Sequence, residues 1–186
     1  MPGNFKKEDL RVLKTKKVLM EAMSKLLEHQ KFTQITVQDL CDKALISRAT
    51  FYSHFADKYD FLKHWLIYMK SETINNVSSN EDIEKSIGDF TDRNSKAIKN
   101  LLEDANSETA GLLCGFMLSL LDISIDQIDG GQKNPKYIVL SKFFCGGLMN
   151  YLQWQVESKF QGDLQIMSSH LYNLLSALLK WYAEQE

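Results

Sequence analysis

Helix-breaking residues are scarce along this chain, and that scarcity constrains its fold more than any other feature. The 186 residues include only two prolines and nine glycines. A many-stranded sheet needs frequent turns, which are built largely from these two residue types, so the composition favours long helices. Apolar residues make up 44% of the chain and charged residues 25%, which suffices for a core in a soluble protein. We therefore expect an all-α fold.

Two short helices separated by three residues are predicted near the N-terminus. Thr36 has an acid, Asp39, three residues later, which suits an N-cap and opens a helix over 37–43. Ser47 is a second N-cap and opens a helix over 48–54. Longer helices are expected around them, over 10–30, from the cap residues Asp57 and Asp60 to about 76, and over 83–103, 109–128, 136–158 and 163–184.

Charge is unevenly distributed along the chain. The formal net charge is −2, but residues 1–64 carry twelve Lys/Arg against eight Asp/Glu, and residues 65–186 carry ten against sixteen. A basic front on an acidic body would turn one end of the molecule toward a polyanion. Chance asymmetry is the alternative explanation.

Several function classes find no support in the sequence. Cys41, Cys114 and Cys145 are too few and too scattered for a disulfide framework, and they are typical of buried thiols in a reducing cytoplasm. The N-terminus does not resemble a signal peptide, and no apolar run approaches the length of a membrane span. The histidines lack metal-ligand spacing, and no catalytic or phosphate-loop pattern occurs. We expect a cytoplasmic protein without enzyme activity, metal or cofactor.

The two short helices after a longer one predict a helix-turn-helix, whose second helix lies in the DNA major groove. Arg48 begins that helix, and a guanidinium can pair bidentately with guanine. Ser47 and Thr50 could contact bases or phosphates, while Tyr52 and His54 could donate to phosphate oxygens. Phe51, Phe55, Leu40 and Ile46 have the spacing of the small core that would hold these helices together.

The stretch ITVQDLCDKALISRATFYSHFADKYDFL, residues 35–62, resembles the DNA-binding signature of the tetracycline-repressor (TetR) family. With Thr15, Ala22, Leu26 and Phe32, the resemblance covers about residues 10–65. It implies two groups of DNA-contacting residues. The implied phosphate anchors are Thr36, Tyr52, His54 and Lys58, and the implied base-facing set is Gln38, Ser47, Arg48, Ala49 and Thr50.

Two residues depart from the family pattern. Leu45 stands where the family usually has glycine, in a turn that favours positive φ. A leucine in a left-handed conformation costs about 1 kcal/mol. Cys41 replaces the usual small alanine. Neither change removes a DNA contact.

The resemblance also implies an architecture of about nine helices. Residues 1–65 would form a three-helix DNA-binding domain, and residues 66–186 a helical domain for ligand sensing and dimerisation. Two copies would pair through the last two helices in a four-helix arrangement, on a palindromic operator. The predicted interface residues are Gly146, Gly147, Leu171, Leu174, Leu175 and Leu178.

A ligand site in the C-terminal half is a further prediction. Large side chains there could line a cavity for a small molecule, although at helical spacing they could equally be ordinary core. The residues concerned are Phe116, Met117, Tyr137, Phe144 and Trp154.

These features point to a sequence-specific transcriptional regulator of double-stranded DNA. The resemblance implies a dimeric repressor that a small-molecule inducer releases from its operator. The main alternative is an activator or coactivator of the same fold, controlled by a protein partner. A helical scaffold that has lost DNA binding is a third possibility, which Arg48, Tyr52, His54 and Lys58 make less attractive.

Overall fold

The structure is a computed structural model, and it describes residues 10–74, 93–102, 108–116 and 135–157, together with a few single positions. Within these ranges the chain is helical and contains no strand. Six α-helices and one 3₁₀ helix have defined bounds there. The all-α prediction is confirmed, while the total of about nine helices depends partly on residues outside these ranges.

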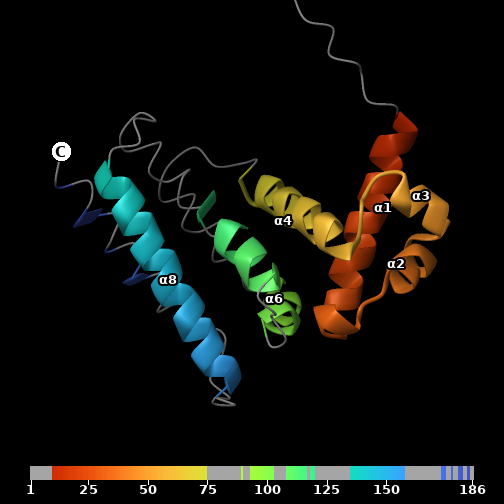
Figure 1. The fold of residues 1–186 in the computed structure, drawn as a ribbon. Helices are drawn as coiled ribbons and strands as arrows, with labels where there is room; N and C mark the ends of the chain where they lie inside the picture. Colours follow the sequence, from red (N-terminus) through yellow and green to blue (C-terminus); the bar gives the residue numbers. More distant parts are fainter. Residues whose placement is uncertain are drawn as a thin grey trace, which may run out of the picture.

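The N-terminal part is built from four α-helices (Figure 1). Helix α1 spans Leu10–Leu27, and the 3₁₀ helix η1 spans Phe32–Gln34. Helices α2 and α3 are short, Val37–Ala44 and Arg48–Tyr52, and α4 spans Lys58–Ile74. These bounds confirm the predicted helices, whereas η1 was not expected because three residues carry no periodic signal.

One apolar core joins these helices. Phe51 of α3 and Phe61 of α4 are completely buried, and their rings meet edge to face with centroids 5.6 Å apart. Phe55 lies against both, at 5.5 and 4.8 Å. The predicted core is confirmed, since Leu40 is fully buried and Ile46 packs against the cluster half-buried.

The same core continues toward the C-terminal helices. Helix α6, Ser95–Leu102, buries Ala97 and Leu101 in it and contacts α1. Asn100 Nδ2 donates to the Leu27 carbonyl oxygen at the end of α1, 2.8 Å away, which satisfies a carbonyl that the helix end leaves free. Residues 108–116 are helical and add Leu113 to the cluster. In Figure 1, α6 lies between α1 and α8.

Helix α8 is the longest described helix, Pro135–Glu157, and agrees with the predicted 136–158. Proline suits the first position of a helix, because the N–H of a residue there would have no partner within the helix and proline has no N–H. None of the helices in the described ranges is long and apolar enough to cross a membrane. The three cysteines are free thiols, two of them buried, and burial raises the pKa of Cys145 to about 12.

Candidate nucleic-acid interface

The start of α2 is fixed by a capping box between Thr36 and Asp39. Asp39 N–H donates to Thr36 Oγ1 over 3.1 Å, and Thr36 N–H donates to the Asp39 carboxylate over 2.8 Å. The Thr36 hydroxyl donates to the same carboxylate over 2.6 Å. These bonds, the hydroxyl first, hold the pKa of Asp39 below its usual value. The predicted N-cap is confirmed, and it orients Thr36 and the exposed Gln38 at one end of α2.

The turn between α2 and α3 is left-handed at Leu45, with φ 56° and ψ 42°. Among the described residues, Leu45 is the only non-glycine with positive φ. The turn is held by N–H groups of Leu45 and Ile46, which donate to carbonyls in the last turn of α2. The Leu45 side chain is 92% exposed, so no packing offsets the backbone strain.

Helix α3 has one face in the core and one in solvent. Phe51 anchors its inner face, while Ser47, Arg48 and Ala49 are exposed and Tyr52 is 48% exposed. Ser47 Oγ accepts from Thr50 N–H over 3.1 Å, as an N-cap should. The helix therefore presents to solvent most of the residues predicted to contact DNA, at its N-terminal end.

Two of these exposed side chains contact each other. The Arg48 guanidinium carbon lies 5.8 Å from the centroid of the Tyr52 ring. This cation–π arrangement favours one orientation of the arginine side chain. His54, half-buried, lies beyond α3 with its ring edge-on to Phe55. Thr36 is exposed at the start of α2. The sequence did not suggest the Arg48–Tyr52 contact, although their i, i+4 spacing on a helix permits it.

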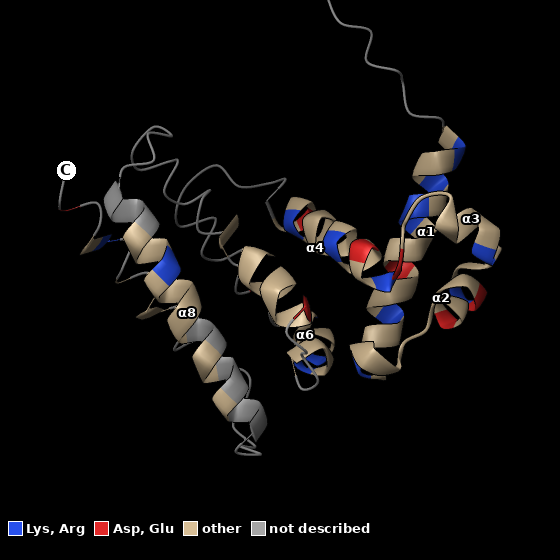
Figure 2. Cartoon of the chain, in the orientation of Figure 1, with Lys and Arg blue, Asp and Glu red and all other residues tan. Residues whose placement is uncertain are grey.

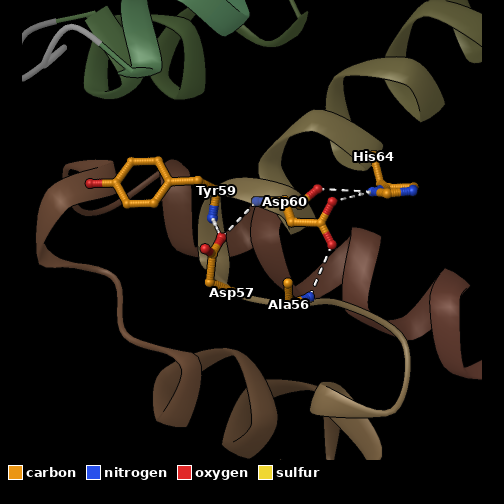
Figure 3. Close-up of polar contacts among 5 residues, drawn as sticks. All are labelled: Ala56, Asp57, Tyr59, Asp60 and His64. Carbon is orange, nitrogen blue, oxygen red and sulfur yellow. Dashed lines mark hydrogen bonds and ion pairs between the residues drawn. The ribbon is translucent and has the colours of Figure 1, made fainter.

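Helix α4 begins with a network of backbone caps (Figure 3). The Asp57 carboxylate accepts from the N–H groups of Tyr59 and Asp60, both over 2.8 Å. Asp60 in turn accepts from the Ala56 N–H over 3.0 Å, and its other oxygen lies 3.6 Å from His64 Nδ1. The predicted cap at Asp57 is confirmed, and it fixes the chain that leads from α3 into α4.

Lys58 is turned toward the protein. Its Nζ lies within hydrogen-bond distance of the carbonyl oxygens of Phe32, Thr33 and Ile35, at 3.2, 3.0 and 3.0 Å. The sequence places Lys58 with the phosphate anchors, and no local pattern predicts these contacts because the acceptors lie 23 to 26 residues earlier. Figure 2 marks other Lys and Arg positions along α1 and on α3.

The predicted pocket residues are described only in part. Phe116 packs half-buried against the main core, and Phe144 is half-buried on α8. Trp154 is half exposed and stacks on Tyr151, with centroids 6.0 Å apart. Met117 and the side chain of Tyr137 lie outside the described residues.

The predicted interface residues are described only in part. Gly146 and Gly147 are exposed on α8, and a Cβ atom added to either would meet no described atom within 4 Å. Leu174 is 59% exposed. The remaining three, Leu171, Leu175 and Leu178, lie outside the described residues.

Comparison with known proteins agrees with this geometry. Residues 19–64, which contain α2, α3 and the start of α4, match the family described as bacterial regulatory proteins, tetR family. The HTH-type transcriptional regulator YxbF of Bacillus subtilis strain 168 is 35% identical over 82 residues. That match covers 42% of this chain and 22% of the relative, so it compares one segment of a longer protein.

Two solved structures share the fold over nearly the whole chain. One is the dihydroxyacetone kinase operon activator DhaS, with 20% identity and a TM-score of 0.59. The match covers 89% of this chain and 96% of DhaS. A TetR transcriptional regulator from Streptococcus agalactiae 2603V covers 90% and is covered over 96%, with 19% identity and a TM-score of 0.55. Residues 19–64 therefore match the tetR family of bacterial regulatory proteins, and the chain shares the all-α fold of these two structures.

Proposed function

We propose that the protein is a transcriptional regulator that binds double-stranded DNA through α3. The observation that carries the proposal is the division of this short helix, which is anchored by buried Phe51 and exposes Arg48 and Ala49 at its N-terminal end. A recognition helix needs this arrangement, because a rigid core must hold it while its first side chains reach base edges. Such a role would place the protein in the bacterial cytoplasm with the DNA.

The predicted DNA-contacting residues divide into two roles under this proposal. Arg48 would read a guanine, with Gln38, Ser47, Ala49 and Thr50 beside it along the groove. Thr36, Tyr52 and His54 would contact phosphates and set the position of α3. The cation–π contact of Arg48 with Tyr52 supports a shared site, since a phosphate contact at Tyr52 would also orient the arginine.

Selection from a random duplex library tests DNA recognition. The full chain is expected to enrich one sequence, and fluorescence anisotropy should give it a Kd at least about a thousandfold tighter than that of a scrambled duplex at the same salt. Arg48→Ala is the control for binding through α3. This variant should bind the selected duplex more weakly while its unfolding curve stays unchanged. Failure of the wild type to enrich any sequence would contradict the proposal.

The protein is further proposed to act as a homodimer that uses α8. This helix carries large apolar side chains in solvent, with Val139 70% exposed and Phe143 80% exposed. Trp154 is 48% exposed and lies about three turns beyond Phe143. Exposed Gly146 and Gly147 leave room beside them for a neighbouring helix. A contiguous apolar face of this kind is typical of protein interfaces. Two-fold pairing would double the DNA readout and require a palindromic operator.

Sedimentation velocity tests the dimer and its surface. Wild type is expected to sediment as a dimer at tens of micromolar, and Phe143→Glu should shift it to the 21.4 kDa monomer. Ile67→Glu is the matched control, because Ile67 is 57% exposed on α4, away from this face. A dimer that is unaffected by Phe143→Glu would remove α8 from the interface, and a monomeric wild type would remove the dimer.

Release from DNA by a small molecule is the form of regulation that we propose. A ligand can shift the equilibrium between the DNA-bound and free states only if it binds these two states with different affinities. The continuous core from α4 through α6 to residues 108–116 gives a physical route between the two halves. A compound screen by thermal shift, followed by anisotropy on the selected duplex, tests this form. A compound that stabilises the protein should weaken its DNA binding.

A further inference from the structure

The inward position of Lys58 suggests a role other than phosphate contact. An ammonium group has three N–H donors, and the three carbonyl oxygens of Phe32, Thr33 and Ile35 lie 3.0 to 3.2 Å from Nζ. Charge-assisted hydrogen bonds of this length are stronger than neutral ones. In this conformation the donors of Lys58 are directed at the protein backbone.

Aromatic side chains enclose the same ammonium. Nζ lies 4.9 Å from the centroid of the Phe32 ring and 5.6 Å from that of Tyr59. The two rings meet edge to face, with centroids 5.3 Å apart. Phe32 and Ile35 are buried, and Lys58 itself is half-buried. Cation–π attraction is larger in such partly desolvated surroundings than at an open surface.

The carbonyl groups that Lys58 contacts belong to η1 and the residue after it. The Phe32 carbonyl also accepts from the Ile35 N–H over 3.1 Å, and a carbonyl oxygen has a second lone pair that Lys58 can use. Ile35 directly precedes Thr36, the N-cap of α2. Lys58 therefore joins the first residue of α4 to the segment that determines where α2 begins, and α2 carries the turn into α3.

We propose that Lys58 is a positioning residue for DNA binding, which fixes α2 and α3 relative to the start of α4 through its three backbone contacts. The proposal rests on the proposed function, in that α3 is the helix that must be positioned. Loss of the ammonium would let the segment 32–35 separate from α4 and misplace the recognition helix. The effect on DNA affinity would come from geometry, without loss of a phosphate contact.

Full-length Lys58→Met and Lys58→Arg variants test the proposal. Methionine keeps an unbranched stem and removes the charge, while arginine keeps the charge but replaces the compact three-donor group with a planar fork. Lys63→Met is the matched control, because Lys63 is exposed on the same helix. DNA affinity is measured by anisotropy across a salt series, and stability by urea unfolding without DNA.

Lys58→Met is expected to lower the unfolding midpoint and to weaken DNA binding about tenfold at every salt concentration. The slope of log affinity against log salt should stay at the wild-type value, and Lys58→Arg should not restore affinity. A slope reduced by about one, with normal stability and rescue by arginine, would overturn the proposal in favour of a phosphate anchor. A less stable variant with wild-type DNA affinity would overturn it too.

NMR of the ¹⁵N-labelled lysine ammonium groups keeps the proposal testable if Lys58→Met does not fold. Wild-type protein without DNA should give one lysine ammonium signal that exchanges slowly with water, assigned to Lys58 by its loss in Lys58→Arg. Rapid exchange of every ammonium would overturn the proposal. A slowly exchanging Lys58 in a protein that selects no DNA sequence would instead contradict the proposed function alone.

Discussion

Helices α1–α4 and helix α8 are both rich in large apolar side chains, yet several of the largest lie in opposite surroundings. In the N-terminal part, Phe51, Phe61 and Leu62 are fully buried by neighbouring helices of the same chain. On α8, Val139 and Phe143 are largely exposed. The N-terminal core is thus complete within one chain, whereas the exposed face of α8 remains available to a second surface. Apolar content alone does not distinguish these situations, because only the arrangement of neighbouring helices decides which face is covered.

The strongest test of this contrast compares Phe51→Ala with Phe143→Ala. Phe51→Ala should lower the free energy of unfolding by about 3–5 kcal/mol, because it leaves a cavity in a closed core. Phe143→Ala should change it by less than about 0.5 kcal/mol at protein concentrations that favour the monomer, since an exposed ring loses little packing. Urea unfolding at low protein concentration measures both free energies. Similar losses for the two variants would mean that Phe143 is covered within its own chain.

A second test asks whether exposed side chains of the N-terminal part contribute to DNA binding rather than to the stability of the fold. Arg48→Ala should weaken binding to the selected duplex by about 1–3 kcal/mol and relax preference at one base pair per half-site. Its unfolding midpoint should stay unchanged, because Arg48 is exposed. Competition among operator variants measures the preference. Lys99→Ala on α6 controls for the loss of one positive charge, and an equal effect there would mean that Arg48 acts only through net charge.

Leu45 is an exposed leucine of the N-terminal part whose backbone, not its side chain, determines its conformation. Leu45→Gly should raise the free energy of unfolding by up to about 1 kcal/mol, because glycine adopts positive φ without strain. Ala49→Gly is the opposite control, since Ala49 is in right-handed helix and glycine there costs about 0.5–1 kcal/mol. Thermal unfolding compares them. A lower free energy of unfolding for Leu45→Gly would instead show that the leucine side chain makes a stabilising contact.

The smallest expected effect concerns Asp39, whose contacts are local and lie at the surface. Its pKa is lowered in the folded state by the Thr36 hydroxyl and N–H. The carboxylate therefore adds stability above its unfolded pKa, and this contribution is lost as pH falls through the lower folded pKa. Asp39→Asn should cost about 0.3–1 kcal/mol at neutral pH and progressively less in acid. Unfolding curves from neutral pH to about pH 2 measure this, and a pH-independent difference would contradict it.

Local features of this protein were predictable from sequence because their partners lie within four residues. Thr36, Ser47 and Asp57 each cap a helix by bonding to backbone N–H groups two or three residues later, and such contacts depend only on short-range geometry. The left-handed turn at Leu45 was expected from the family resemblance, because the family usually has glycine at this position. The inward side of α3 followed from the spacing of Phe51 and Phe55.

Contacts over long sequence separations were decided by the tertiary structure. Lys58 reads as a surface cation at a helix start, but packing of α4 against residues 32–35 directs it to backbone carbonyls more than twenty residues away. The exposed face of α8 could not be chosen either, because apolar residues occur on several of its sides and neighbouring helices cover only some of them. Helical periodicity states which residues share a face, whereas the packing of distant segments decides whether that face meets the core, the solvent or another molecule.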